Sequence, residues 1–358
     1  MFFCYNTNGS IKKNGADSLK KFLKIISWII GVLLGIALCI FIAFEVSPRP
    51  GVFVIKKAFE GQDKVTEVKS YNENKEKVTK ISDIAYKSEY KKNQLDIYYP
   101  KGTAEKLPVI FWVHGGGYVA GDKSGMEEFA LRITSQAKVA VVSVNYELAP
   151  DLEYPGQVKQ VDEMYRYLSK QKSKYPMLDF DHVFFGGDSA GSQIALQYAA
   201  IQTNSEYAKQ MKMDQAVKPQ HIIGTISYCG PVDLKQTANE HSDDRFLKFF
   251  VKTVAWSLIG EKDWKNSPQL LEASLVDHVT KDFPPTYITD GNAFSFQKQG
   301  IAFADKLKQL NVPVQTLFYD GENKVITHEY QFDYTTQEAE TCYQQTVEFI
   351  QQQISRAT

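Results

Sequence analysis

The chain has 358 residues, 43% of them hydrophobic, so it is long enough to bury the core of one large domain or two small ones. Its 41 basic and 42 acidic side chains give a formal net charge of −1 at pH 7. This balance leaves no excess of basic residues for binding nucleic acid, and no nucleic-acid partner is expected.

Residues 25–44 form an uncharged run of twenty residues. As an α-helix this run would be about 30 Å long, enough to cross the hydrocarbon core of a bilayer, so it predicts a transmembrane helix. Basic residues are more frequent before the run, at Lys12, Lys13, Lys20, Lys21 and Lys24, than after it, at Arg49, Lys56 and Lys57. The positive-inside rule therefore predicts a single-pass protein of the cell membrane, with residues 1–24 in the cytoplasm and the remainder outside.

Two other interpretations of this run are open. A cleaved signal peptide has the same polarity, but the run is longer than a usual signal-peptide core, and Ile42-Ala43-Phe44-Glu45 offers no cleavage site between small residues. A buried core helix would normally be shorter or amphipathic. The favoured prediction is an uncleaved anchor.

Beyond this run the composition changes twice. Residues 45–80 are rich in Lys, Glu, Asn and Gln with weak periodicity, which predicts a linker or a loosely packed helical arm. In residues 81–358, short apolar runs alternate with longer amphipathic ones, a pattern typical of an α/β domain whose mostly parallel sheet is covered by helices on both faces. Strands are predicted at 84–86 and 95–99, which would form a hairpin, and at 109–113, 139–144, 183–185, 222–228, 287–289 and 314–319. Helices are predicted at 126–137, 157–172, 189–201, 296–310 and 337–355.

Residues 187–191 read Gly-Asp-Ser-Ala-Gly and lie between an apolar run and a helical pattern. A serine at such a strand-to-helix turn needs glycine two residues away on both sides, because the close approach of strand and helix leaves no room for Cβ atoms. The helix beginning at Ser189 also directs N–H groups toward developing negative charge. The motif predicts a nucleophilic Ser189; the alternative is a glycine-rich turn without chemistry.

Residues 114–117 read His-Gly-Gly-Gly and follow another predicted strand. Successive glycines let the backbone approach a substrate and present the N–H groups that an oxyanion needs. The predicted donors are the N–H groups of Gly116, Gly117 and Ala190. His114 follows the wrong strand for a general base, so we expect it to shape the loop by a hydrogen bond. A glycine triplet alone could be a flexible loop, but its pairing with the serine motif is a strong joint signal.

These two motifs, together with Asn145-Tyr146-Glu147-Leu148-Ala149-Pro150, Tyr154-Pro155 and Asp162, resemble the α/β-hydrolases of the hormone-sensitive-lipase-like esterase group. The resemblance runs from about residue 95 to the C-terminus. It implies an α/β-hydrolase fold, a catalytic triad with an oxyanion hole, and ester hydrolysis through an acyl-enzyme. It leaves the acyl group open.

The chain order of this family places the histidine base after the last strand, which favours His328, with His278 in reserve. The acid is expected after the penultimate strand, where the sequence reads Asp290-Gly291-Asn292. The family usually carries an acid-x-Asp pattern here, so Asp290 matches the first position and Asn292 replaces the expected aspartate. Asp290 is the predicted triad acid, and the alternatives are the Asn292 position, Asp320 and Glu322.

Residues 233–284 are too many for a simple strand-to-strand connection, and we expect a cap-like insert. Phe246, Phe249 and Phe250 share one helical face, which predicts packing with partial exposure to an acyl pocket.

The sequence contains no HExxH, CxxC or P-loop motif, so neither a metal nor another cofactor is predicted. Cys229 and Cys342 are too few for a disulfide framework, and two buried free thiols are expected. The predicted function is that of a membrane-anchored carboxylesterase acting outside the membrane on short-acyl or acetyl esters, including those of surface carbohydrate. A peptidase or amidase of the same fold and a catalytically silent surface-binding module are the alternatives.

Overall fold

The computed structural model describes residues 8–61, 64–240, 242–319, 321 and 323–357, with side chains from residue 18 onward. The chain divides into two compact units, Met1–Gly51 and Val52–Thr358. The first consists mainly of one long helix, α1 (Asn8–Val46). Its segment Ser18–Val46 is long and apolar enough to cross a membrane, as a membrane anchor or a signal sequence would be, and it contains the predicted run 25–44.

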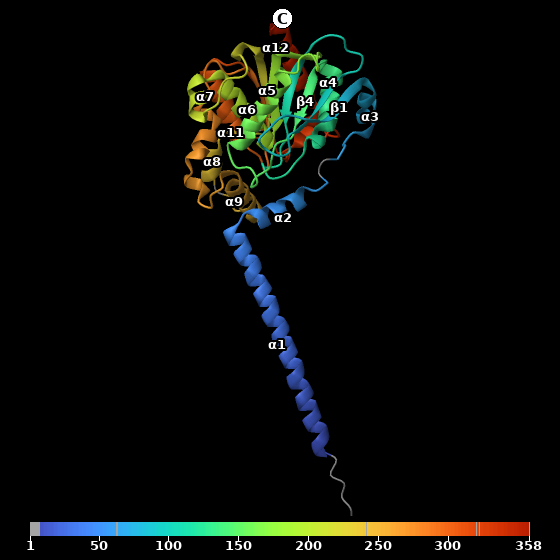
Figure 1. Cartoon of the computed structure of the whole chain (residues 1–358), viewed down its shortest axis with the longest axis vertical. Coiled ribbons are helices and arrows are strands. Elements are labelled where there is room, and N and C mark those ends of the chain that lie inside the picture. The colour runs from blue at the N-terminus through green and yellow to red at the C-terminus, as the bar shows by residue number, and fades with distance from the viewer. Residues whose placement is uncertain (1–7, 62–63, 241, 320, 322, 358) are drawn as a thin grey trace, which may run out of the picture. The chain divides into compact units, whose positions relative to one another are not determined.

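A central sheet lies between the helices of the second unit (Figure 1). It has eight strands, in the order β1-β2-β4-β3-β5-β6-β7-β8. Its strands are β1 (Val78–Ala85), β2 (Gln94–Pro100), β3 (Leu107–Val113), β4 (Ala140–Val144), β5 (Leu178–Asp188), β6 (Ile222–Tyr228), β7 (Thr286–Thr289) and β8 (Val314–Leu317). β2 is antiparallel to both β1 and β4, and the other pairs are parallel. The predicted mostly parallel sheet with an initial hairpin is therefore confirmed.

Each face of this sheet has its own hydrophobic core. Successive side chains of a strand point to opposite faces, so Val109, Phe111 and Val113 of β3 pack into one core, and Ile110 and Trp112 pack into the other. The first core also includes α5 (Gly156–Ser169), α6 (Ser189–Thr203) and α11 (Gln297–Gln309); the second includes α4 (Glu127–Ala137) and α12 (Gln337–Ala357). Helices cover both faces, as predicted.

The segment before the sheet is more tightly packed than its composition predicts. Residues 45–80, predicted to be a linker or loosely packed arm, contain α2 (Arg49–Phe59), α3 (Val68–Lys77) and the beginning of β1. Val52 and Ile55 of α2 are buried in the first core, and the Tyr71 hydroxyl of α3 donates a hydrogen bond to Glu127 of α4 at 2.8 Å. The second unit thus begins at Val52, whereas the sequence places the domain start at residue 81. The reason is that a few apolar side chains at helical spacing are sufficient to dock an otherwise polar segment.

The connection between β6 and β7 is helical, as the predicted insert requires. It contains α8 (Leu234–Asn239), α9 (Arg245–Ile259) and α10 (Pro268–Ala273). Asp233 precedes this group and accepts a hydrogen bond from the N–H of Gln236, so it caps α8.

Candidate active site

Ser189 lies at the turn from β5 to α6, and its φ of 46° is in the left-handed region. A Cβ atom on Gly187 would lie 2.5 Å from the carbonyl oxygen of Val113, and one on Gly191 would lie 2.0 Å from the same oxygen. Side chains at either position would collide with β3, so the glycines of the motif are required by packing. The turn presents the Ser189 side chain to a pocket that His328 also lines.

His328 follows β8 and lies next to Ser189. Its Nε2 is 3.0 Å from the Ser189 Oγ, a distance suited to proton transfer. Three other histidines lie elsewhere: the His278 ring stacks on Tyr207 at 3.8 Å, and His182 and His221 lie beside Asp179 and Asp181. His241 lies outside the described residues.

Asp290 lies on the other side of the imidazole. Its Oδ1 is 3.5 Å from Nδ1 of His328, within ion-pair range but longer than a good hydrogen bond. The carboxylate is buried, and its two oxygens accept backbone N–H groups, from Gly291 at 2.8 Å and from Phe296 at 2.6 Å. These bonds fix a negative charge where a triad acid would stabilise the imidazolium.

Asn292 has a different set of partners. Its amide nitrogen donates to the carbonyls of Tyr319 at 3.2 Å and Lys324 at 2.9 Å, and its oxygen accepts the N–H of Ile326 at 2.9 Å. The side chain therefore fastens the loop that carries His328 to the end of β7. Asp320 and Glu322, the other acid candidates, lie outside the described residues.

Glu329 is a second carboxylate in the site, and the sequence analysis did not identify it. Its Oε1 is 3.8 Å from His328 Nε2, and its Oε2 is buried without a hydrogen-bond partner among the described residues. Burial raises the pKa of the Glu329 carboxyl, although the charge of His328 opposes this. The only signal in the sequence is its position directly after the predicted base.

These carboxylates control the charge of the imidazole. Burial alone would lower the pKa of His328, but Asp290, Glu329 and Asp188 outweigh it and raise the pKa to about 9. The pKa of Asp188 is itself raised well above its ordinary value, by burial and then by the charge of Glu329. His328 therefore needs alkaline pH to be neutral, the form that can accept a proton.

The glycine loop is shaped to offer free N–H groups. Gly116 and Gly117 have φ values of 102° and 59°, and neither N–H donates a hydrogen bond within the part of the chain that the structure describes. Ala190 lies in the first turn of α6, where N–H groups lack acceptors within the helix. His114 is buried with Nδ1 2.8 Å from the Gly115 carbonyl oxygen, and burial lowers its pKa to about 4, so it is a neutral loop-shaping residue, as expected.

A cavity of about 730 Å³ opens over Ser189 and the glycine loop. The predicted insert supplies much of its apolar wall, through Phe250, Val254 and Trp264. The Phe250 ring comes within 3.0 Å of the position that a Cβ on Gly117 would occupy, whereas Phe246 stacks on Phe250 and is 53% exposed. The expected combination of packing with partial exposure to the pocket is confirmed for Phe250.

Cys229 lies beside the Asp290–His328 pair, and donor atoms of the three residues are within 4.8 Å of one another. Burial, followed by the charge of Glu329, raises the pKa of the Cys229 thiol well above its ordinary value. The other two members of the cluster, Asp290 and His328, are paired with each other beside Ser189. We therefore assign the cluster to the candidate triad. Cys229 and Cys342 are both free and buried, as predicted.

Solved structures share this architecture. A hyperthermophilic esterase from Pyrobaculum calidifontis aligns with a TM-score of 0.67 and 19% identity, over 90% of this chain and 97% of that one. Identity this low shows the fold alone, and the predicted α/β-hydrolase fold is confirmed.

The sequence relatives include proteins named as esterases. An esterase of Gibberella moniliformis is 24% identical over 74% of this chain and 80% of its own length, and an acetyl esterase of Salmonella schwarzengrund is 26% identical over 65% and 68%. Matches to proteins of Acanthamoeba polyphaga mimivirus and Arabidopsis thaliana span 61% and 36% of those proteins, less than two thirds of their length. The predicted kinship with α/β-hydrolase esterases is confirmed. The BD-FAE family model matches residues 95–307, more than half of the 358 residues, and the chain belongs to the BD-FAE family.

Proposed function

We propose that this protein is a membrane-anchored carboxylesterase of the serine hydrolase type. The observation that carries the proposal is the 3.0 Å distance between Ser189 Oγ and His328 Nε2, beside a loop with free N–H groups. The names of the sequence relatives, which include esterases and an acetyl esterase, support ester hydrolysis.

In this proposal, neutral His328 takes the proton of Ser189 as Oγ attacks the ester carbonyl. The N–H groups of Gly116, Gly117 and Ala190 hold the oxyanion of the tetrahedral intermediate. The imidazolium, stabilised by Asp290, then protonates the departing alcohol, and water activated by the same histidine releases the acyl group. His328 passes on each proton within the same half-reaction: the proton of Ser189 goes to the departing alcohol, and the proton of water goes back to Ser189.

The proposed substrate is a class of esters rather than one compound. An acetyl or other short acyl group agrees with the relative named acetyl esterase. The cavity of about 730 Å³ is much larger than an acetyl group, so it leaves room for a bulky alcohol part. We place residues 25–44 in the membrane as an uncleaved anchor, residues 1–24 in the cytoplasm and the hydrolase domain outside, because of the apolar length of α1 and the lysines before it.

A fluorophosphonate probe tests the proposal directly. The detergent-solubilised full chain should be labelled stoichiometrically at Ser189, as located by mass spectrometry. Labelling should disappear in Ser189→Ala, weaken in His328→Ala and persist in Ser124→Ala, a matched control because Ser124 lines the same cavity. The activity of the unlabelled enzyme should then be compared on p-nitrophenyl acetate and p-nitroacetanilide, with the ester favoured. No labelling of a folded chain would refute the proposal.

A further inference from the structure

α2 has an outward face of aromatic and basic residues. Its inner residues Val52, Ile55 and Phe59 pack on the first core. The exposed residues on the remaining surface include Phe53, Val54, Lys56 and Lys57. The Phe53 ring is 62% exposed, and the ammonium group of Lys57, one turn later, lies 6.0 Å from the centre of that ring.

The N-terminal half of α9 repeats this arrangement. Its inner residues Phe250, Val251 and Val254 line the active-site pocket. Its exposed residues include Arg245, Phe246, Lys248 and Lys252. Neither helix contains an acidic residue. Exposed acidic residues lie just outside them, at Glu60, Glu240, Asp243, Asp244, Glu261 and Asp263, and Glu60 pairs with Lys57 at 2.6 Å. The excess of basic residues is therefore confined to the helices themselves.

The two helices are neighbours in the second unit. The Phe59 and Phe250 rings lie 6.0 Å apart, and both helices lie at the same end of that unit (Figure 1). We call their exposed residues the α2–α9 face: Phe53, Val54, Lys56, Lys57, Arg245, Phe246, Lys248 and Lys252. The helices that carry this face also line the pocket with their inner sides, at Phe59 and Phe250.

We propose that the α2–α9 face docks on the surface of a bilayer containing anionic phospholipid, and that the substrate passes from this bilayer into the pocket. Exposed aromatic side chains beside lysines and arginines are characteristic of helices that lie at a membrane interface, where the rings insert and the cations bind anionic headgroups. The predicted membrane anchor also lies close to this face in the sequence. α2 begins at Arg49, and only Ser47 and Pro48 separate it from Val46, the last residue of the membrane-spanning candidate.

The inference rests on the proposed function and names its substrate class. The substrate is an ester whose larger part is apolar and resides in the bilayer. An acetyl or other short acyl group on such a molecule fits the same description, because the cavity can take the bulky part.

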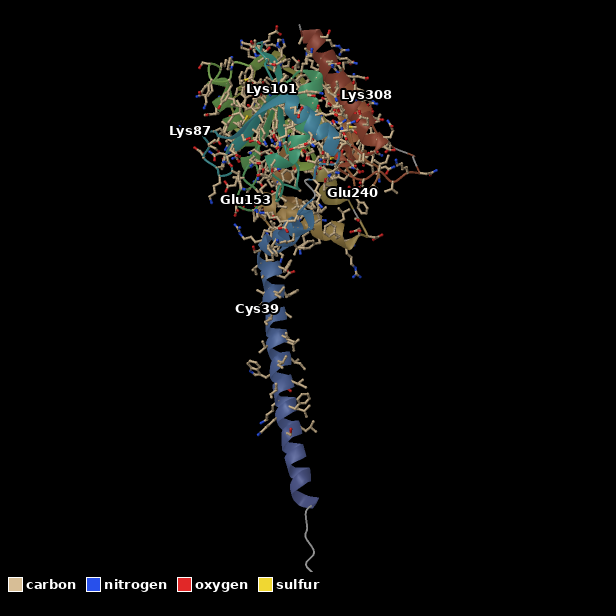
Figure 2. All side chains as sticks on the ribbon, turned by 90° about the vertical axis from the view of Figure 1, so that its right-hand side faces the viewer. Cys39, Lys87, Lys101, Glu153, Glu240 and Lys308 are labelled. Carbon is tan, nitrogen blue, oxygen red and sulfur yellow. The ribbon has the colours of Figure 1, made fainter. Side chains whose placement is uncertain are left out.

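Docking is tested without reference to catalysis. The full chain carrying Cys4→Ser and Cys39→Ser leaves only the buried thiols Cys229 and Cys342, so a cysteine introduced by Phe246→Cys can be labelled with the fluorophore NBD. In nanodiscs of phosphatidylcholine with phosphatidylglycerol, this label should emit at shorter wavelength and resist quenching by dithionite. A label at Lys101→Cys should remain aqueous, because Lys101 lies at the far end of the second unit from α2 (Figure 2). Equal quenching at both positions would overturn the docking proposal.

Delivery of substrate is tested by kinetics in the same nanodiscs. Lys248→Glu with Lys252→Glu should reduce hydrolysis of bilayer-dissolved hexadecyl acetate about tenfold and leave hydrolysis of water-soluble p-nitrophenyl acetate unchanged. The matched control is Lys87→Glu with Lys101→Glu, two exposed lysines away from the face (Figure 2), which should alter neither rate. Equal effects of the α9 and control variants on hexadecyl acetate, or hydrolysis of p-nitrophenyl acetate alone by the unaltered chain, would overturn the inference. If the unaltered chain hydrolyses neither ester, the proposed function fails, while the NBD result still decides docking.

Discussion

Replacing Asp290 with asparagine removes the charge beside His328 and keeps the shape of the side chain. The two charges are 3.5 Å apart when His328 is protonated, and Asp290 is 2% exposed. With an effective dielectric constant of about 20, their interaction is about 4 to 5 kcal/mol. If this stabilisation is lost in the transition state, kcat/KM falls about a thousandfold.

The assay is kcat/KM on p-nitrophenyl acetate, with thermal unfolding as the measure of folding. The matched control is Asn292→Ala, which removes a polar side chain two residues away. It breaks three hydrogen bonds to the loop that carries His328, so it should lower the free energy of unfolding by about 1 to 3 kcal/mol. Its folded fraction should keep kcat/KM within about tenfold of the unaltered enzyme.

The opposite pattern would refute the assignment. If Asp290→Asn stays within tenfold of the unaltered enzyme while folded Asn292→Ala loses a thousandfold, the amide at 292 orients the histidine. Asp290 would then be a structural acceptor for the N–H groups of Gly291 and Phe296.

Three further predictions concern other parts of the chain. Because His328 acts as a base only when neutral, kcat/KM should rise with pH to a half-maximum near 9. Glu329→Gln removes a negative charge 3.8 Å from Nε2 of His328 and so destabilises the imidazolium, which should lower the midpoint of the pH–rate profile by about one pH unit. An unchanged midpoint would contradict the role given to Glu329. A chain beginning at Lys56 loses the buried Val52 and Ile55, and urea unfolding should show it about 3 kcal/mol less stable than one beginning at Arg49; equal midpoints would mean that α2 does not stabilise the domain. Gly116→Ala places a Cβ 2.3 Å from the Ala120 carbonyl oxygen at a φ of 102°, and kcat on p-nitrophenyl acetate should fall at least about a hundredfold, whereas a near-normal kcat would exclude this loop as the oxyanion hole.

The sheet and its helices could be predicted because their signals are local. Buried strands such as β3 read as short apolar runs, and the glycines around Ser189 form a local motif, although the atom that excludes their Cβ atoms, the Val113 carbonyl oxygen, belongs to β3. The order of the motifs along the chain also indicated His328, which lies beside Ser189.

The choice between Asp290 and Asn292 could not be made in the same way. The two residues are two positions apart on one loop, and the sequence does not say which side chain faces the imidazole. The structure shows that partners more than twenty residues later, at Tyr319, Lys324 and Ile326, engage Asn292. Tertiary hydrogen bonds of this kind leave no periodic or compositional pattern.

The segment between α2 and α3 shows how composition can mislead. Its polar residues predict a solvated linker, yet the N–H of Thr66 donates to Glu128 at 2.7 Å, and the Thr66 hydroxyl donates to the Phe332 carbonyl at 3.1 Å. The N–H of Tyr334 in turn donates to that hydroxyl at 3.2 Å. Polar groups satisfied by one another allow a segment to pack as closely as an apolar one. The same bonds join the segment after α2 to the loop that follows His328.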